Sequence, residues 1–197
     1  MSNLDFALIG SGGCAKEILA HMNQDLPCFV DQEYMTKDTF LLDDFNPQKY
    51  KALVAIADPI IRRNIVNRLP LETTYFSYIH PSTIVLDDKI KVAAGSFVGA
   101  NCVLTTNINL GKHLLLLRGN HISHDCKIGD FFTALPNSSV SGGVHIGNSV
   151  LLGAGTQIRE NIHILSNITV GMGSIVVNDL IDQGIYFGSP AYFRSDD

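Results

Sequence analysis

Polar residues with the means to do chemistry crowd one stretch of this 197-residue chain, RGNHISHDC at 118–126. Within it, His124 is followed directly by Asp125. A histidine beside a carboxylate can serve as a general base, because the acid can fix the imidazole tautomer and raise its basicity. The alternative is that both are solvated turn residues. That alternative applies equally to the other histidines of this region, His113, His145 and His163.

A second group of residues near the N-terminus could bind an anion. The apolar run 6–9 predicts a buried strand, and the pattern of Ile18, Leu19 and Met22 predicts one face of a helix. Between them lies a G-x-G-x-x-A turn made of Gly10, Ser11, Gly12, Gly13, Cys14 and Ala15. Glycines let the backbone approach a phosphate, and a helix N-terminus favours negative charge. Asp31 follows at the spacing at which a carboxylate meets a ribose hydroxyl.

The segment 1–79 is predicted to be a βαβ domain, half of a Rossmann fold. Further strands are expected at 27–30, 53–57 and 75–79, with a loop at 33–48 and a helix from Pro59 to about Leu69. So short a segment holds one mononucleotide-binding half, which favours a single nucleotide or nucleotide sugar over NAD. A tight turn without any ligand is the structural alternative.

The elements that position His124 follow a six-residue period. Every sixth residue from Leu86 to Val176 is apolar, and fifteen of these sixteen are Leu, Ile or Val. This period predicts a parallel β-helix in which each hexad forms one side of a triangular prism. A sandwich of short strands would tolerate irregular spacing. Six glycines directly follow these apolar residues, and we expect them to supply left-handed backbone at the corners: Gly99, Gly111, Gly129, Gly147, Gly153 and Gly171.

His80-Pro81 marks the predicted domain boundary, since proline biases the preceding residue to extended backbone. His80 is in phase with the repeat, and we expect it to cap the prism. Cys126 occupies a position that small residues share along the repeat, so it is expected to pack in a corner. The other members of that position are Ser96, Cys102, Ser138 and Ser174.

Composition narrows the function classes. A net charge of −5 argues against a non-specific nucleic-acid role. The first ten residues lack the pattern of a signal peptide, and the longest apolar run of the repeat, 114–117, is too short to span a membrane. The four cysteines form no C-x-x-C pair, which predicts reduced cysteines, a cytoplasmic location and no zinc site.

Several motifs resemble one known family along nearly the whole chain. They are GSGG at 10–13, HPS at 80–82, HDCKIGDF at 124–131, SGGVHIG at 141–147 and FGSPA at 187–191. They resemble bacterial nucleotide-sugar acetyltransferases of the left-handed β-helix, hexapeptide-repeat superfamily. That group includes UDP-4-amino-sugar N-acetyltransferases, GDP-perosamine N-acetyltransferases and sialic-acid O-acetyltransferase-like proteins.

The resemblance implies a left-handed parallel β-helix at 80–197, with a C-terminal tail, that transfers an acetyl group from acetyl-CoA without a metal. The acceptor would be the C4 amine of a nucleotide-linked 4-amino-4,6-dideoxy sugar in glycan biosynthesis. His124 matches the general base, and Asp125 matches the acid that tunes it. The backbone N–H of Gly142 would stabilise the thioester oxygen, and transfer would be direct.

The resemblance also implies where the substrates bind. Gly12, Gly13 and Cys14 would lie at the phosphates, Asp31 and Gln32 near the ribose or base, with Asp58 and Arg62 bordering the same crevice. CoA would lie near Thr133, Gly142, Ala154 and Met172, with its adenine towards Pro190 and Ala191. The family forms homotrimers with sites between subunits.

Departures from the family pattern leave alternatives open. Relatives place histidine where this chain has Cys14 and Thr133, and asparagine where it has Leu117. The changes at Thr133 and Leu117 lie close to the expected acetyl and sugar positions and allow a different sugar, acyl group or acceptor atom, so a sugar O-acetyltransferase is one alternative. A non-catalytic nucleotide-sugar-binding protein is another. A metal-dependent hydratase using His121, His124 and His145 is a third, although the His-x₄-His spacing of that group is absent.

Overall fold

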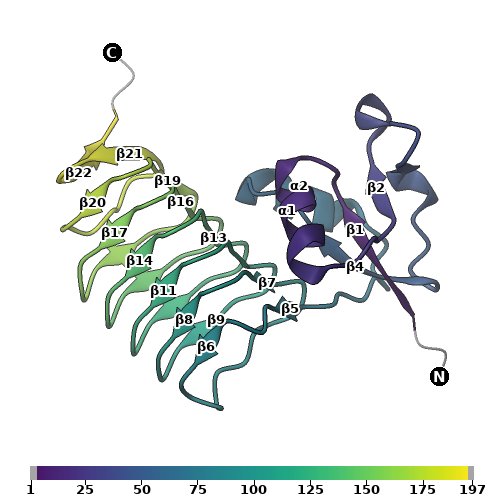
Figure 1. Ribbon diagram of the computed structural model, residues 1–197. Coiled ribbons are helices and arrows are strands. Elements are labelled where there is room, and N and C mark those ends of the chain that lie inside the picture. Colours follow the sequence, from purple (N-terminus) through teal and green to yellow (C-terminus); the bar gives the residue numbers. More distant parts are fainter. Residues whose placement is uncertain (1–3, 195–197) are drawn as a thin grey trace.

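The computed structural model describes residues 4–194, which form a small α/β layer followed by a long β-coil (Figure 1). The layer is a four-stranded parallel sheet in the order β3-β2-β1-β4. Its elements are β1 (Asp5–Ile9), α1 (Gly13–Met22), β2 (Cys28–Val30), β3 (Phe40–Leu41), β4 (Tyr50–Val54) and α2 (Pro59–Arg68), with 3₁₀ turns at Gln32–Tyr34 and Leu42–Asp44. No described helix has the length and apolar character needed to cross a membrane.

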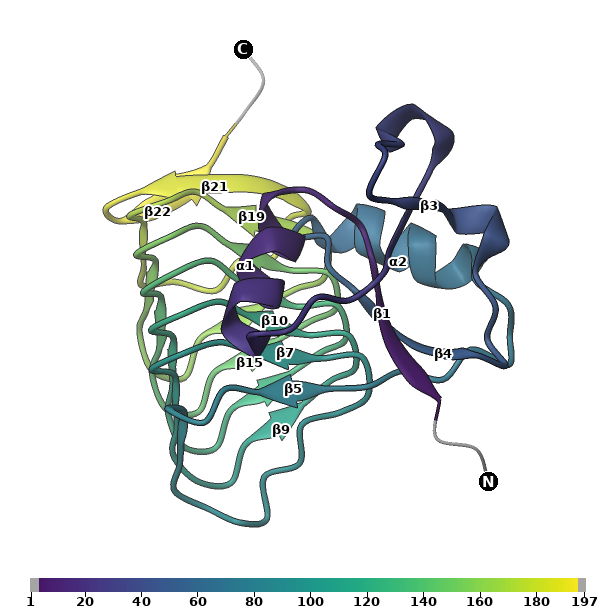
Figure 2. The same cartoon turned by 45° about the vertical axis from the view of Figure 1, so that its right-hand side comes forward.

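Both faces of this sheet are covered, which explains why its central strands are apolar without alternation. Leu8 and Leu53 pack with Ile18 of α1, and Ile9 and Val54 pack with α2. The first of these clusters also includes side chains from the outer face of the coil, so the sheet is joined to the coil by a shared apolar core. Figure 2 shows α1 in front of β7 and β10, the strands of the coil that contribute to this shared core.

The coil consists of three parallel sheets, the three sides of the prism (Figure 1). The largest contains β5 (Tyr78–Ile79), β7 (Phe97–Val98), β10 (Leu115–Leu116), β13 (Thr133–Ala134), β16 (Leu151–Leu152), β19 (Ile168–Val170), β21 (Gly184–Gly188) and the antiparallel β22 (Ala191–Phe193). The second contains β6 (Ile84–Val85), β8 (Val103–Leu104), β11 (His121–Ile122), β14 (Ser139–Val140), β17 (Gln157–Ile158) and β20 (Ile175–Val176). The third contains β9 (Asn109–Leu110), β12 (Lys127–Ile128), β15 (His145–Ile146) and β18 (His163–Ile164).

The predicted inward stacking is confirmed from Val98 to Val176. Every sixth residue of that span is buried in one core, and each pairs with its counterpart one turn of the coil away, as Leu116 does with Ala134. The prediction is wrong for the first turn, which is one residue longer than the others. There Ile79 pairs with Val98 and Val85 with Leu104, so His80 is not in phase and Leu86 is 67% exposed.

The expected role of the six corner glycines is also wrong. None of them has φ in the left-handed range; they are glycine because adjacent turns approach closely. A Cβ on Gly129, for example, would lie 2.8 Å from the carbonyl oxygen of Gly147. The left-handed residues come two positions later, again every sixth residue: Asn101, Asn107, His113, Gly119, Asp125, Phe131, Asn137, Gly143, Ser149, Gly155, Asn161, Asn167 and Gly173.

Two strand predictions need correction. The strand predicted at 53–57 is Tyr50–Val54, and the one predicted at 75–79 is divided between two sheets. Tyr75 forms a bridge with Ala52 of the N-terminal sheet, whereas Tyr78–Ile79 pairs with β7 of the coil. The chain passes between the two sheets at Ser77, whose hydroxyl donates to the carbonyl of Ala93 at 2.8 Å.

Candidate active site

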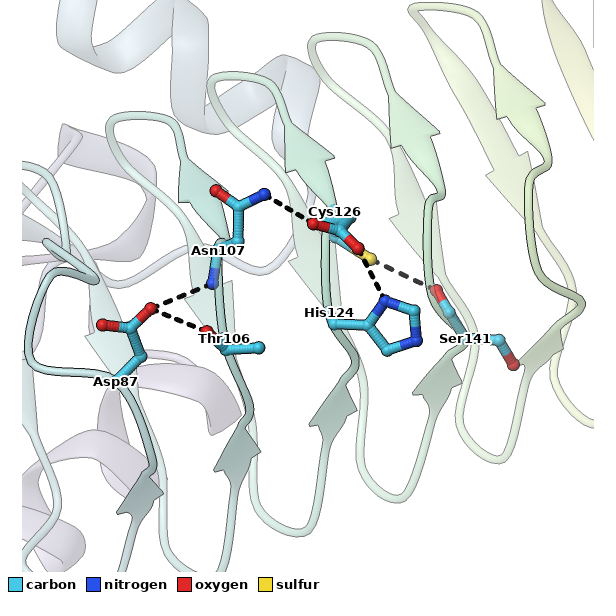
Figure 3. A network of polar contacts seen from close by, with 7 residues as sticks. Asp87, Thr106, Asn107, His124, Cys126 and Ser141 are labelled. Atoms are coloured by element: carbon cyan, nitrogen blue, oxygen red, sulfur yellow. Dashed lines mark hydrogen bonds and ion pairs between the residues drawn. The ribbon is translucent and has the colours of Figure 1, made fainter.

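His124 and Asp125 lie at the corner between β11 and β12, two and three residues after the inward-pointing Ile122. Both side chains are more than half exposed. His124 Nδ1 lies 2.8 Å from Asp125 Oδ2 (Figure 3). Because the carboxylate accepts at Nδ1, the arrangement favours the tautomer that leaves Nε2 free to take a proton. The corner thus presents an exposed imidazole whose Nε2 has no hydrogen-bond partner among residues 4–194.

Asp125 is held from its other side by Asn107, which lies one turn of the coil earlier. Asn107 Nδ2 donates to Asp125 Oδ1 at 2.5 Å. The hydrogen bonds from Asn107 and then from His124 lower the pKa of Asp125, so this carboxyl is ionised at neutral pH. Sequence analysis missed Asn107, although its distance of one full turn from Asp125 could have indicated the contact.

The imidazole of His124 lies over Gly142, one turn of the coil later. A Cβ on Gly142 would lie 2.5 Å from His124 Nε2, so a larger residue there would displace the ring from this position. Among residues 4–194, no acceptor takes the Gly142 N–H. The structure therefore brings a free imidazole nitrogen and a free backbone donor together, as a base and an oxyanion donor would require.

Cys126, the other reactive residue type at this corner, packs as predicted. Its side chain is buried, and Sγ donates to the carbonyl of Ser141 at 3.2 Å (Figure 3). Burial raises the pKa of the thiol, which keeps it protonated and a poor nucleophile.

A second candidate site lies at the carboxyl ends of β1 and β2. A cavity of about 350 Å³ opens there beside the start of α1. Four of the predicted nucleotide-binding residues line it, namely Gly10, Ser11, Gly12 and Asp31. The remaining walls are largely apolar and come from Ile9, Phe29, Val30, Tyr34, Leu42, Ile56, Ile61 and Ile65. A Cβ on Gly12 would meet no protein atom within 4 Å, so this glycine leaves open space at the cavity.

Asp31 is paired with a residue that sequence analysis missed, Arg68 at the end of α2. The guanidinium holds both carboxylate oxygens, at 2.6 and 3.0 Å. This hydrogen-bonded pairing with Arg68 lowers the pKa of Asp31. The carboxylate is therefore fixed at the edge of the cavity with its free lone pairs available to a hydroxyl.

Arg62, predicted to border the crevice, is fully buried between the N-terminal layer and the coil. Its guanidinium donates to five backbone carbonyls and does not line the cavity, contrary to the expectation that it borders this crevice. Neither do the other four predicted residues line it. Asp58 caps α2, since its carboxylate accepts from the backbone N–H groups of Ile60 and Ile61 at 2.8 and 2.9 Å. Cys14 lies in α1, and burial raises the pKa of its thiol to about 11. Gly13 begins α1, and Gln32 is exposed in a 3₁₀ turn.

The predicted CoA-binding residues do not form one cluster in a single chain. Thr133 is buried, and its hydroxyl donates to the carbonyl of Ala57 at 2.7 Å, so it joins the two parts of the molecule. Gly142 follows β14, whereas Ala154 and Met172 follow β16 and β19 at a different corner. Met172 is 79% exposed. Pro190 and Ala191 lie in the terminal hairpin formed by β21 and β22.

Residues 4–194 contain no group of three or more His, Cys, Asp or Glu side chains arranged to hold a metal ion. His121 projects from β11, His124 from the next corner and His145 from β15. The geometry required by the hydratase alternative is therefore not found in the described part of the chain.

No family model matches the chain. In sequence, it is 23% identical over 177 residues to GDP-perosamine N-acetyltransferase of Escherichia coli O157:H7, covering 80% of this chain and 79% of that one. It is 30% identical over 116 residues to acyl-[acyl-carrier-protein]–UDP-N-acetylglucosamine O-acyltransferase of Pseudomonas putida (strain W619), covering 58% of this chain. The match spans only 45% of the length of that curated relative.

Two solved structures share the fold along nearly the whole chain. A histidine-to-asparagine mutant of perosamine N-acetyltransferase from Caulobacter crescentus, in complex with CoA and GDP-perosamine, gives a TM-score of 0.87 at 24% identity, covering 98% of this chain and 97% of that one. The acetyltransferase domain of PglB from Neisseria gonorrhoeae FA1090 gives 0.84 at 24% identity, covering 96% and 99%. These matches confirm the left-handed β-helix. The predicted resemblance is confirmed as well, since these similar proteins are hexapeptide-repeat acyltransferases of nucleotide sugars.

Proposed function

We propose that this protein is an acetyl-CoA-dependent N-acetyltransferase that acts on the C4 amine of a nucleotide-linked 4-amino-4,6-dideoxy sugar. The observation that carries the proposal is the position of the His124 imidazole. It lies between a carboxylate at Nδ1 and the Gly142 backbone at Nε2. The relative named GDP-perosamine N-acetyltransferase supports the same substrate class.

In this mechanism, the amine nitrogen attacks the thioester carbonyl while His124 Nε2 accepts the amine proton. The N–C bond forms, the C–S bond breaks, and the proton passes to the departing CoA thiolate. Asp125 stabilises the imidazolium, and the Gly142 N–H donates to the carbonyl oxygen as it gains charge. A positioned base contributes about 10²–10⁴-fold to the rate. No acyl-enzyme forms, which agrees with the buried, protonated state of Cys126.

We assign nucleotide binding to the N-terminal layer, as half of a Rossmann domain that ends before Ser77, and acetyl transfer to the coil, which begins with β5 at Tyr78. The phosphates would lie against Gly10, Ser11 and Gly12, where the N-terminus of α1 favours negative charge. A ribose hydroxyl would donate to Asp31. The apolar walls of the cavity would enclose the base.

We further propose a cytoplasmic homotrimer in which each active site lies between two copies. In one chain, Gly142 and Ala154 lie at different corners of the prism. A single CoA would contact both if it lay between two copies, with Gly142 from one copy and Ala154 from the other. This arrangement would also retain Met172, Pro190 and Ala191 as CoA contacts. It would suit an enzyme of polysaccharide or glycan biosynthesis.

A thiol-release assay tests the proposal. Purified protein receives acetyl-CoA and a panel of UDP-, GDP- and dTDP-4-amino-4,6-dideoxy sugars. We expect turnover of one sugar, its loss in His124→Ala and its retention in His121→Ala, which removes an exposed histidine from neighbouring β11. Full activity of His124→Ala would exclude it as the base. A protein that binds neither acetyl-CoA nor any nucleotide sugar would refute the transferase assignment.

Sugar O-acetylation is the second candidate, because a stretch of 116 residues of this chain is similar to an O-acyltransferase. It shares the base and the CoA site, and a hydroxyl must lose its proton during attack. Release of thiol with the 4-hydroxy sugars and none with the amino sugars would select it. Binding of a nucleotide sugar without turnover of either set would select a non-catalytic binding protein.

A further inference from the structure

A chain of polar contacts links three successive turns of the coil at the corner of His124 (Figure 3). Asp87 Oδ2 accepts from the backbone N–H of Asn107 at 3.1 Å and from the hydroxyl of Thr106 at 2.8 Å. Asn107 donates through its side chain to Asp125, and Asp125 accepts from His124. The contacts therefore connect the first turn of the coil to the imidazole, with Asn107 donating to both carboxylates.

Each contact in this chain fixes the next. The Asp125 carboxylate is more than half exposed, and nothing in its packing would stop it from rotating away from His124. The amide of Asn107 holds Oδ1, so Oδ2 is left facing Nδ1. An amide N–H can only donate, and it therefore selects the ionised carboxylate, which in turn selects a proton on Nδ1.

Asn107 is itself held in place. Its backbone is left-handed, with φ of 52°, a conformation that asparagine tolerates better than most residues. The Asp87 carboxylate fixes the peptide N–H at this position, and hydrogen bonds from the backbone of Lys89 and Asn107 and from the Thr106 hydroxyl lower its pKa to about 2. Asp87 is therefore a permanent acceptor at physiological pH.

We propose that Asn107 is a positioning residue for the base His124, acting through Asp125, and that Asp87 anchors Asn107. This inference rests on the proposed function in assigning His124 as the base. It extends that function by naming a residue that sets the tautomer of the base without touching either substrate.

The test uses Asn107→Gly, since glycine accepts the same left-handed backbone and removes only the amide. Asn107→Asp is the second variant, because it keeps the shape and replaces the donor by an acceptor that repels Asp125. The ¹⁵N–¹H long-range NMR spectrum of His124, recorded at alkaline pH without substrates, reports the tautomer. We expect the Nδ1–H form in the parent protein and a mixture of tautomers in both variants.

Kinetics give the second readout. We expect kcat to fall about tenfold in Asn107→Gly, a part of what a positioned base supplies, with both KM values unchanged. The matched control is Asn101→Gly, one hexad earlier at the same left-handed corner position, which should leave the tautomer and kcat unchanged. A parent-like tautomer and kcat in Asn107→Gly would overturn the inference. Because the NMR readout needs no turnover, it remains decisive even if the proposed reaction is wrong.

Discussion

Arg62 Nε donates to the carbonyl oxygen of His113 at 3.0 Å, joining helix α2 to a coil corner 51 residues further along the chain. The same guanidinium donates to four more backbone carbonyls. On the N-terminal side these are Ile56 and Ala57, at 2.5 and 3.0 Å, and on the coil they are Phe131 and Phe132, at 2.8 and 3.2 Å. Burial lowers the pKa of Arg62 to about 10, so it remains a cation at neutral pH. This side chain therefore bonds the N-terminal layer to two corners of the coil.

We predict that Arg62→Met destabilises the protein by about 3 kcal/mol, because it leaves several buried carbonyls without a donor. Chemical denaturation followed by circular dichroism measures this loss. The matched control is Arg63→Met on the same helix, whose guanidinium contacts Ser149 Oγ and Asn167 Oδ1 at 3.2 and 3.3 Å. Arg63→Met should lower the free energy of unfolding by about 1 kcal/mol or less. Equal losses in the two variants would contradict the assigned role of Arg62.

His113 predicts an acid-sensitive junction. Its ring is buried between Phe131 and Tyr75, and Nδ1 has no partner among residues 4–194. Burial first, and then the charge of Arg62, lower its pKa from 6.5 to about 4. Between these values the unfolded chain binds a proton that the folded chain does not. The free energy of unfolding should therefore fall as pH drops from 6.5 to 4.

His113→Asn tests this prediction, since asparagine tolerates the left-handed backbone at this corner and does not titrate in the window. Urea unfolding at a series of pH values compares the two proteins. The difference between their stabilities should narrow as the pH falls from 6.5 to 4. A constant difference across this window would show that His113 does not titrate as the structure indicates.

Features that depend on a local sequence pattern could be predicted from the sequence, and features that depend on long-range contacts or on backbone conformation could not. The coil core was predictable because each inward residue is set by its own hexad, as Ile122 and Val140 illustrate. The left-handed corners were misplaced, since residues as different as Asn107 and Phe131 occupy them. They share a backbone conformation and not a side-chain type.

The residues of the two candidate sites also differ in whether neighbours in the sequence or distant segments determine their contacts. His124 and Asp125 are adjacent in sequence, so their pairing was predictable. The burial of Arg62 was not, because three of the five carbonyls that accept from it belong to coil segments 51 to 70 residues away. Gly12 lines the cavity, and its place there was predictable because a strand, a turn and a helix start surround it in the sequence. Arg68 was missed because its partner, Asp31, lies 37 residues away in the sequence.

Alanine substitutions at Gly10 and Gly12 should have different effects, the first on the free energy of unfolding and the second on nucleotide affinity. Gly10 has φ of 110°, and a Cβ there would lie 3.2 Å from the carbonyl oxygen of Ala55. Gly10→Ala should therefore lower the free energy of unfolding by about 1–3 kcal/mol. Gly12→Ala meets open space and should leave stability unchanged while weakening nucleotide binding about tenfold, since its methyl group would occupy the place of a phosphate. Isothermal titration with UDP, GDP and dTDP, beside denaturation, measures both effects. Unaltered nucleotide affinity in Gly12→Ala would argue against phosphate binding at this turn.

Gly142→Ala should damage catalysis without damaging the fold. Gly142 is not in the left-handed region, so alanine fits its backbone, but the new methyl group would displace the His124 ring. We expect kcat to fall at least about tenfold, because Nε2 would no longer lie beside the Gly142 N–H. Steady-state kinetics with the sugar found in the thiol-release assay measures the loss, and the thermal unfolding midpoint checks the fold. Ser141→Ala, at the adjacent residue, should keep full activity, since its change leaves the space over Gly142 free. If Gly142→Ala matched Ser141→Ala in kcat, the imidazole would not depend on this glycine, and the oxyanion role of its N–H would lose its geometric support.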